Sequence, residues 1–310
     1  MHQTILTKLH STPEIMLGRI HSGRSSIVCA FKNGISHPLW VAKTTHDYGS
    51  MWRLQREYEA LTYLEPWAQQ LCIPQVLKCD QGECEFVLIL SGVPGRRENI
   101  ALRVNAAEAD LHRSFDEPIA WVRRFQSQVR APQPMTLDMV ANDYVERLSP
   151  WTKSSTAMES MIALLGESAT AGSRKAVPVH ADFHPTNVLF LRPGLSVIDW
   201  NSFASGFPLQ DIFSFVVNAN YYCPGRILSL LENYHHAFFS KSRLCEFVRS
   251  LIEAEEWSAP EARFLFYCFL ATQICADAST PNQVWLRLVG YLSQHGWPGP
   301  GTPLESPGNS

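Results

Sequence analysis

The stretch that decides the fold of this chain is His180-Ala181-Asp182-Phe183-His184-Pro185-Thr186-Asn187, followed by Val197-Ile198-Asp199-Trp200. Phosphoryl transfer needs a carboxylate beside the attacking hydroxyl and oxygen ligands that hold Mg²⁺ on the ATP phosphates. Asp182 can supply the first, and Asn187 and Asp199 can supply the second. Oxygen ligands suit Mg²⁺, which takes one or two protein carboxylates together with waters and phosphates. The stretch therefore predicts a phosphotransferase centre with Asp182 as the catalytic base and Asn187 and Asp199 as metal ligands.

Two short apolar runs, at residues 188–191 and 195–198, flank the turn signal Arg192-Pro193-Gly194 and predict a β-hairpin. Pro193 lies midway between Asn187 and Asp199, so a turn centred there would bring these two residues side by side. Pro185 is expected to keep the preceding loop from becoming helical. A polar loop before an ordinary hairpin is the alternative. The whole pattern of His-x-Asp, Asn and a later Asp is far more specific than its parts.

The segment resembles the phosphotransferase family that includes aminoglycoside phosphotransferases, choline kinases and related small-molecule kinases. Protein kinases have His-Arg-Asp and Asp-Phe-Gly where this chain has His180-Ala181-Asp182 and Ile198-Asp199-Trp200. Residues 206–212, Gly-Phe-Pro-Leu-Gln-Asp-Ile, are similar to the family's Gly-x-Pro-x-x-Asp-Leu/Ile element. The resemblance implies that Asp211 braces the catalytic loop. We expect His180 to be a buried scaffold residue of that loop, and His184 is assigned no role.

The resemblance implies an α+β, protein-kinase-like fold with two lobes. The N-terminal lobe would hold a small antiparallel β-sheet with one helix, and the C-terminal lobe would be mainly helical. The expected organisation is a nucleotide-binding lobe at 1–90, a hinge at 91–95, and a catalytic and substrate-binding lobe at 96–296. Residues 297–310 are rich in Pro, Gly and Ser and are expected to form a disordered tail.

In the N-terminal lobe, turn signals and apolar runs predict strands at residues 14–20, 27–31 and 39–43, then a helix at 51–64. The third strand ends in Lys43 and resembles the kinase strand that carries the ATP-binding lysine. Glu57 lies in a segment that resembles the family's Arg-Glu-x-x-x-Leu helix. The resemblance implies that Glu57 orients Lys43 toward the α- and β-phosphates. The alternative for Glu57 is a solvated helix carboxylate, and Glu59 should face elsewhere.

Two loops are expected to complete the nucleotide site. The polar turn at residues 21–26 would cover the phosphates through Ser22, Gly23 and Ser25, although its glycines are sparse and an ordinary hairpin turn is the alternative. Further strands are predicted at residues 73–77 and 86–90. The segment Ser91-Gly92-Val93-Pro94-Gly95 then indicates a linker. In the family the hinge backbone pairs with adenine, so the resemblance places Ser91 and Val93 there.

The rest of the chain is predicted to be mainly helical, with helices at 117–129, 141–148, 156–165, 212–219, 226–239, 243–255, 260–276 and 284–292, and a strand at 176–179. The acceptor wall is expected after Asp211. Acidic residues could receive a cationic substrate, or aromatic residues could cage an ammonium group; solvated helix faces are the alternative. The acidic set is Glu232, Glu253, Glu255, Glu256 and Asp277, and the aromatic set is Tyr221, Tyr222, Tyr234, Trp257 and Tyr267.

The composition of the 310 residues is that of a globular protein, 45% hydrophobic and 18% charged, long enough for two cores. A net charge of −3 argues against nucleic acid or an anionic membrane as a partner. No run of eighteen apolar residues and no apolar signal segment is present, so we expect a cytoplasmic protein. The eight cysteines form no Cys-x-x-Cys pair and suit a reducing compartment. Cys79 and Cys84 are expected to flank a turn rather than to bind a metal.

The sequence therefore predicts an enzyme that uses ATP and Mg²⁺ to phosphorylate a hydroxyl of a small molecule, such as an aminoglycoside, an amino alcohol or a sugar. One alternative is an atypical protein kinase of the same fold. Another is a pseudokinase-type nucleotide-binding module, which would lack at least one catalytic position. Lys43, Asp182, Asn187 and Asp199 are all present in this chain.

Overall fold

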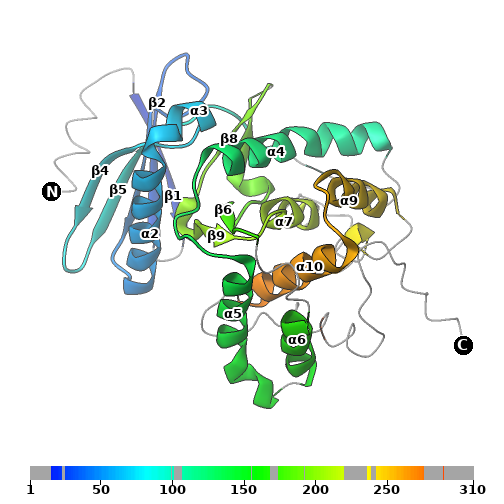
Figure 1. Ribbon diagram of the computed structural model, residues 1–310. Helices are drawn as coiled ribbons and strands as arrows, with labels where there is room; N and C mark the ends of the chain where they lie inside the picture. The colour runs from blue at the N-terminus through cyan, green and yellow to red at the C-terminus, as the bar shows by residue number, and fades with distance from the viewer. Residues whose placement is uncertain are drawn as a thin grey trace, which may run out of the picture. The chain divides into compact units, whose positions relative to one another are not determined.

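The computed structural model describes residues 15–22, 25–98, 100, 107–154, 156–167, 174–191, 193–219, 236–238, 242–275 and 289 (Figure 1). The chain folds into two compact units. The first comprises Met1–Glu98 and Thr186–Phe203, and the second comprises Asn99–Pro185 and Ala204–Ser310. The predicted α+β class is confirmed, because the first unit contains an antiparallel sheet and the second is mainly helical.

A five-stranded antiparallel sheet forms the body of the first unit, in the order β1-β2-β3-β5-β4. Its strands are β1 (Ile15–Ser22), β2 (Ser25–Lys32), β3 (Trp40–Thr45), β4 (Val76–Gln81) and β5 (Phe86–Ser91). Alternate residues of β5, namely Phe86, Leu88 and Leu90, are buried, as expected for a strand with one face on a core. The strands predicted at 14–20, 27–31, 39–43 and 86–90 are confirmed within a few residues.

The strand predicted at residues 73–77 is present as β4, but it begins three residues later than predicted, at Val76. The chain first completes a short helix, α3 (Ala68–Leu71), which ends at Cys72 in the left-handed conformation (φ 52°). The N–H of Ile73 then donates to the carbonyl of Ala68, so the segment that follows is a connection. The turn between β4 and β5 lies at residues 82–85, so Cys79 lies on β4 and Cys84 lies within the turn rather than at its edge as predicted.

Helix α2 (Tyr48–Leu64) packs against β3, β4 and β5 (Figure 1). It buries Leu54, Leu61 and Leu64, the apolar positions at helical spacing, and it also buries Glu57. The predicted helix is confirmed, but its predicted start at Met51 is three residues late. Asp47 has extended backbone and accepts a hydrogen bond from the N–H of Ser50, which caps the helix at Tyr48.

The segment after β5 passes close to the residues that precede β3, and the closest approach is at Gly92. The N–H of Gly92 donates to the carbonyl of Leu39 over 2.9 Å. A Cβ atom at this position would lie 1.6 Å from the carbonyl oxygen of Pro38, so only glycine fits without displacing the backbone. Gly92 therefore fixes the path of the chain where it leaves the sheet.

The first unit also contains the hairpin predicted at residues 188–198. It consists of β7 (Val188–Phe190) and β8 (Leu195–Val197), which pair antiparallel. The hydroxyl of Ser196 donates to the carbonyl of Pro94, and Arg96 exchanges backbone hydrogen bonds with Phe190. These contacts attach the hairpin to the segment that follows β5.

The second unit is built on helices with one two-stranded sheet, β6 (Val177–Val179) with β9 (Ala204–Gly206). Its helices are α4 (Glu108–Gln128), α5 (Leu137–Leu148), α6 (Thr156–Glu167), α7 (Gln210–Asn218), α9 (Arg243–Ala254) and α10 (Ala259–Ile274). The predicted helices and the predicted strand at 176–179 are confirmed within a few residues, except for the start of α4, whereas β9 was not predicted. The helices predicted at 226–239 and 284–292 lie outside the described residues apart from 236–238 and 289, as does the predicted tail.

Helix α4 begins at Glu108 rather than at the predicted Glu117, and Pro118 lies inside it. Proline removes one backbone hydrogen bond from a helix but does not necessarily end it, because packing can hold the two halves in line. The burial of Phe115, Ile119 and Trp121 on both sides of Pro118 provides that packing.

The core of the second unit is rich in aromatic side chains around α7, all of whose residues are buried. Phe215 on α7 lies 5.3 Å from Phe183, centroid to centroid, and Phe183 stacks on Trp121 at 5.5 Å and 9°. Such pairs add about 0.5–1.5 kcal/mol each beyond the area they bury. They fix the loop that contains Phe183 to α4 and α7.

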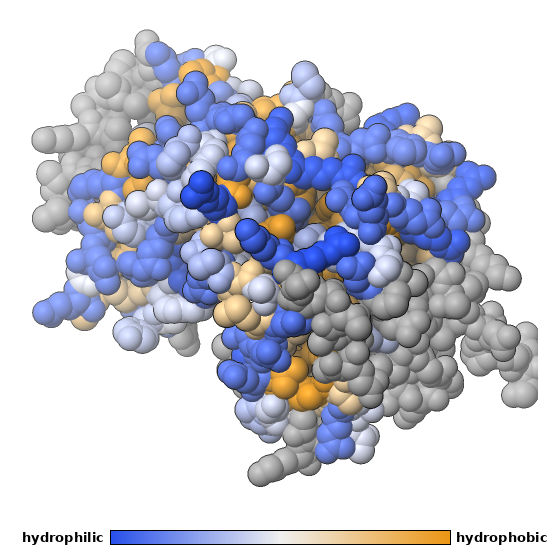
Figure 2. All heavy atoms as spheres, in the orientation of Figure 1, coloured by the Kyte–Doolittle hydropathy of each residue, from blue (hydrophilic) through white to orange (hydrophobic). Residues whose placement is uncertain are grey.

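The surface over α4 and α9 is mainly hydrophilic on the face shown in Figure 2. Among the residues that the structure describes, no helix combines the length and apolar composition needed to cross a membrane.

Candidate active site

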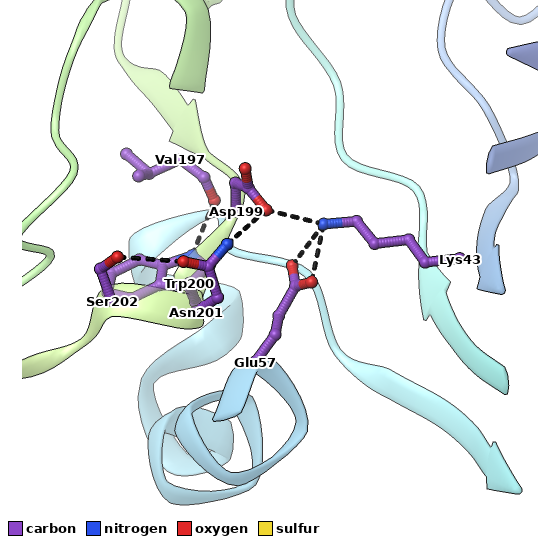
Figure 3. Close-up of polar contacts among 7 residues, drawn as sticks. All are labelled: Lys43, Glu57, Val197, Asp199, Trp200, Asn201 and Ser202. Atoms are coloured by element: carbon purple, nitrogen blue, oxygen red, sulfur yellow. Dashed lines mark hydrogen bonds and ion pairs between the residues drawn. The ribbon is translucent and has the colours of Figure 1, made fainter. Parts of the chain in front are cut away.

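Lys43, Glu57 and Asp199 meet in the first unit (Figure 3). Lys43 lies on β3, Glu57 on α2, and Asp199 directly after β8. The Lys43 Nζ atom lies 2.7 Å from both carboxylate oxygens of Glu57 and 2.9 Å from Oδ1 of Asp199. The predicted contact between Lys43 and Glu57 is therefore present. An ammonium group has three N–H donors, and here all three have a carboxylate oxygen within hydrogen-bonding distance.

Burial distinguishes the two carboxylates. The side chain of Glu57 is 1% exposed, whereas that of Asp199 is 39% exposed. The alternative of a solvated helix carboxylate is thus wrong for Glu57. Glu59 is exposed and accepts a hydrogen bond from Gln55, so it faces away from Lys43 as predicted.

The charges of this group depend on one another. Burial lowers the pKa of Lys43, but the attraction and hydrogen bonds of Glu57 and Asp199 outweigh it, so its pKa lies above the ordinary value. Burial raises the pKa of the Glu57 carboxyl, while Lys43 and the backbone N–H of Trp200 act in the opposite direction. Lys43 is therefore positively charged, and its charge opposes the rise that burial causes in the pKa of Glu57.

Asp199 occupies a strained position after the hairpin, with left-handed backbone (φ 67°, ψ 64°). Such a conformation costs a non-glycine residue about 1–3 kcal/mol and is common at functional sites. Trp200, which is fully buried, begins a 3₁₀ turn (Trp200–Ser202), and its Nε1–H donates to the carbonyl of Val197. The same turn packs against α2. The burial of Trp200 therefore fixes the turn that presents Asp199.

The hairpin register differs slightly from the prediction. Val188 pairs with Val197, and the N–H of Ile198 donates to the carbonyl of Asn187. Ile198 is thus opposite Asn187, and Asp199 is one residue further along. The two predicted metal ligands belong to the open end of the same hairpin, but they are not a directly opposed pair.

The predicted catalytic loop lies in the second unit, after β6. Asp182 is 42% exposed, and its Oδ1 lies 3.2 Å from Nε2 of His184, which is buried. His180 is fully buried, and its Nδ1 accepts a hydrogen bond from the N–H of Asp182, so it is a scaffold residue as predicted. Pro185 does not exclude helical structure, since a single 3₁₀ turn runs from Pro185 to Asn187.

Asp211 braces this loop, as the family resemblance implied. Its two carboxylate oxygens accept hydrogen bonds from the N–H groups of His180 (2.8 Å) and Ala181 (3.0 Å). Ala181 has left-handed backbone (φ 63°), an uncommon conformation for alanine. The two hydrogen bonds to a fully buried carboxyl offset this strain and position the Asp182 that follows.

The environment of Asp211 leads to a prediction about pH. Burial raises the pKa of Asp211 to about 7; the charge of Asp182 acts in the same direction, and the two N–H groups oppose it. The pKa of Asp211 in the folded chain exceeds its pKa in the unfolded chain, which is about 4. The folded chain therefore binds the proton more tightly than the unfolded chain. This binding stabilises the fold fully below about pH 4, and the stabilisation is lost as pH rises through about 7. Asp211→Asn cannot ionise. We expect the stability advantage of the wild-type chain over Asp211→Asn to be larger at about pH 5 than at about pH 8.

Urea unfolding of both chains at the two pH values measures this difference. An advantage that stays constant or grows with pH would mean that Asp211 is ionised throughout this range in the folded chain.

The structure describes only part of the two loops that were predicted to bind the nucleotide, at residues 21–26 and 91–95. Ser22 pairs with Ser25 across the β1–β2 hairpin, and Gly23 lies outside the described residues. The N–H of Ser91 donates to the carbonyl of Gln75, and its hydroxyl accepts from the N–H of Gln75. Val93 is buried. The backbone donor of Ser91 is thus already used within the unit.

The candidate acceptor residues are only partly described. Tyr267 is 1% exposed in the core and cannot form part of an aromatic cage, so its inclusion in the aromatic set is wrong. Glu255 forms a 2.8 Å ion pair with Arg123. Glu232, Asp277, Tyr221, Tyr222 and Tyr234 lie outside the described residues.

Sequence reasoning missed three polar side chains at these sites. His184 contacts Asp182, Asn201 donates to Asp199, and Ser202 donates to Asn201. The position of His184 between Asp182 and Asn187 in the motif could have indicated its contact with Asp182. Nothing in the residue pattern distinguishes the other two from ordinary turn residues.

Comparison with known proteins identifies the class. The model of the phosphotransferase enzyme family (APH) matches residues 20–247. The chain belongs to this family, and it is therefore an enzyme of the kinase class. No curated protein sequence matches it.

Solved structures of aminoglycoside phosphotransferases share the fold. A thermostable mutant of APH(4)-Ia, in ternary complex with ADP and hygromycin B, is 14% identical with a TM-score of 0.60, over 96% of this chain and 98% of that one. ADP-bound APH(2'')-Ib is 17% identical with a TM-score of 0.59, over 95% and 97%. The streptomycin–ATP complex of APH(2'')-IIa is 17% identical with a TM-score of 0.58, over 95% and 96%. The predicted protein-kinase-like fold is thus confirmed.

Proposed function

We propose that this kinase transfers the γ-phosphoryl group of ATP to a hydroxyl of a small molecule. The observation that carries the proposal is the Lys43 ammonium group, which Glu57 holds at 2.7 Å and Asp199 at 2.9 Å. A strand lysine fixed by a helix carboxylate is the arrangement that kinases use to hold nucleotide phosphates. Complexes of structural neighbours with ADP and with ATP support the choice of nucleotide.

The nucleotide would be held from three directions in the first unit. Lys43 would contact the α- and β-phosphates, with Glu57 fixing its orientation. Ser22 and Ser25 pair at the ends of β1 and β2. We assign Ser22, Gly23 and Ser25 to the phosphates, which they would approach with hydroxyl and backbone N–H groups. Ser91 and Val93 would line the adenine end. Because the N–H of Ser91 is bonded to Gln75, we assign the adenine hydrogen bond to Val93.

The donor set fits a magnesium ion. Asn187 offers an amide oxygen and Asp199 a carboxylate oxygen, and both belong to the end of the β7–β8 hairpin. Mg²⁺ accepts such hard oxygen donors and takes the rest of its coordination from phosphates and water. When bound there, the ion neutralises charge on the phosphates.

Asp182 is assigned as the base. It would accept the proton of the acceptor hydroxyl while the hydroxyl oxygen forms a bond to the γ-phosphorus and the bond to the ADP oxygen breaks. The contact with His184 at 3.2 Å limits the rotation of the Asp182 carboxylate. Its 42% exposure leaves the carboxylate accessible to a substrate.

The acceptor would be a hydroxylated small molecule such as an aminoglycoside, an amino alcohol or a sugar. Neighbours crystallised with hygromycin B and with streptomycin support this class. Release of ADP by the purified chain, measured across a panel of such compounds and a mixture of peptides, tests the proposal. Turnover with peptides alone would favour the protein-kinase alternative.

Removal of the metal with a chelator tests whether the proposed reaction depends on a divalent cation. We expect ADP release to require Mg²⁺ or Mn²⁺ and to stop in excess EDTA, because the proposed ligands are oxygen atoms without nitrogen or sulfur. Addition of Mg²⁺ in excess of the chelator should restore the rate. Full activity in EDTA would contradict the assignment of Asn187 and Asp199.

A further inference from the structure

The carboxylate of Asp199 receives a second hydrogen bond, from a residue of its own turn. The amide Nδ2 of Asn201 lies 3.2 Å from Oδ1 of Asp199, the same oxygen that lies 2.9 Å from Lys43 Nζ. The hydroxyl of Ser202 lies 3.0 Å from Oδ1 of Asn201. Figure 3 shows this chain of contacts and shows the other carboxylate oxygen of Asp199 pointing away from both Lys43 and Asn201.

The Asp199 carboxylate determines which way the Asn201 amide faces, because an ionised carboxylate only accepts hydrogen bonds and the amide must present its NH₂ group to it. An amide oxygen only accepts hydrogen bonds, and the Ser202 hydroxyl can donate one to it. With its oxygen held by Ser202, the amide presents its NH₂ group to Asp199. The hydrogen bond from Ser202 therefore supports the amide orientation that the Asp199 carboxylate requires.

Lys43 alone cannot keep Asp199 oriented when a nucleotide binds. Its three N–H donors are all directed at carboxylate oxygens, so contact with a phosphate requires one of them to be exchanged. Glu57 is 1% exposed and contacts Lys43 through both oxygens, whereas Asp199 is 39% exposed and contacts Lys43 through Oδ1. The contact with Asp199 is the weaker of the two and the one that can be exchanged.

We propose that Asn201 is a positioning residue that orients the Asp199 carboxylate toward a divalent cation, supported by Ser202. This inference rests on the proposed function, in which Asp199 is a metal ligand. The torsion that turns a carboxylate about its last C–C bond is soft, so a donor on Oδ1 is needed to direct Oδ2. Because Asn201 lies in the same 3₁₀ turn as the buried Trp200, it stays beside Asp199 when Lys43 moves to the phosphates.

A neutral amide suits this role. A cationic donor at the same place would orient the carboxylate but would also repel the cation, and it would offset the charge that attracts it. An acidic side chain would repel Asp199 and could not donate. Asn201 supplies a hydrogen bond and leaves the charge of Asp199 unchanged.

The test measures binding of Mn²⁺ to the purified full-length chain in the presence of ADP, from the electron paramagnetic resonance signal of free Mn²⁺. Hydrogen-bond partners of metal ligands change metal affinity by about 10–100-fold when they are removed. We expect Asn201→Ala to weaken Mn²⁺ binding by about tenfold. Ser202→Ala keeps the amide and loses only its support, so it should show a smaller loss of the same sign.

Two measurements separate positioning from a general loss of structure. The thermal unfolding temperature and the affinity for ADP in EDTA should both be near the wild-type values in Asn201→Ala, since neither depends on the Asp199 orientation. If Asn201→Ala does not fold, the loss in Ser202→Ala decides the matter. Unchanged Mn²⁺ affinity in the folded variants overturns the inference and leaves the proposed function intact. No ADP-dependent Mn²⁺ binding by the wild-type chain overturns both.

Discussion

Asp182→Asn should slow phosphoryl transfer by about two to four orders of magnitude, the range that general-base catalysis contributes. Asparagine preserves the volume of the side chain and can still accept a hydrogen bond from His184. It cannot take up the proton of an acceptor hydroxyl at neutral pH. The loss should therefore appear in kcat, measured by ADP release at saturating ATP and acceptor, while the affinity for Mg-ATP is retained.

Asp199→Ala should behave differently, because it removes a proposed metal ligand and one of the two carboxylates that contact Lys43. We expect it to weaken binding of Mg-ATP and also to reduce turnover. Asp116→Asn is a matched control, since Asp116 is an exposed carboxylate on α4 whose described contact is with His112. If Asp182→Asn and Asp199→Ala lose the same nucleotide affinity, the separate roles assigned to these residues are wrong.

The parts of the molecule that could be predicted from the sequence are those fixed by local patterns. The hairpin at residues 188–198 follows from two apolar runs around a Pro-Gly turn, and it forms β7 and β8 as expected. The contact between Lys43 and Glu57 followed from two motifs, each recognisable by itself. The residue types of neighbouring positions determine the hairpin, whereas the contact between Lys43 on β3 and Glu57 on α2 was implied by the family resemblance.

The errors occur where tertiary contacts override a local signal. The helix predicted to start at Glu117 begins at Glu108, because burial of Phe115, Ile119 and Trp121 keeps α4 continuous through Pro118. The apolar run from Ile73 suggested a strand, but the left-handed residue Cys72 and the hydrogen bond from Ile73 to Ala68 delay β4 until Val76. Neither contact can be read from the segment itself.

The polar contacts of the site also depend on tertiary structure that the local sequence does not predict. Asn201 and Ser202 are common turn residues, and their contact with Asp199 depends on the left-handed backbone of that residue and on the burial of Trp200. The division of the chain is also non-local, because Thr186–Phe203 folds with the sheet of the first unit although about ninety residues separate them in sequence. A pattern of residue types contains no information about either relation.

Lys43 and Glu57 should behave as one unit in catalysis. Lys43→Ala removes the proposed phosphate contact, and Glu57→Ala removes the carboxylate that fixes it, so each should raise the KM for ATP or lower kcat. The double variant should be little worse than the poorer single variant, because residues that act through each other have non-additive effects. The measurement is kcat/KM for ATP in the four chains of the cycle.

Stability should distinguish the two single variants. Removing one partner of a buried ion pair costs about 3–5 kcal/mol when the other is left uncompensated. Lys43→Ala leaves Glu57, 1% exposed, without a cation and beside Asp199, whereas Glu57→Ala leaves Lys43 in contact with Asp199. We therefore expect Lys43→Ala to lower the unfolding temperature more than Glu57→Ala, and the double variant to recover part of that loss.

Glu59→Ala is the matched control for this cycle, since Glu59 lies on the same helix but is exposed and bonded to Gln55. It should leave both kcat/KM and the unfolding temperature close to the wild-type values. Fully additive losses in the double variant would show that Lys43 and Glu57 act independently. The 2.7 Å contact would then contribute to the fold of the first unit without orienting the lysine for catalysis.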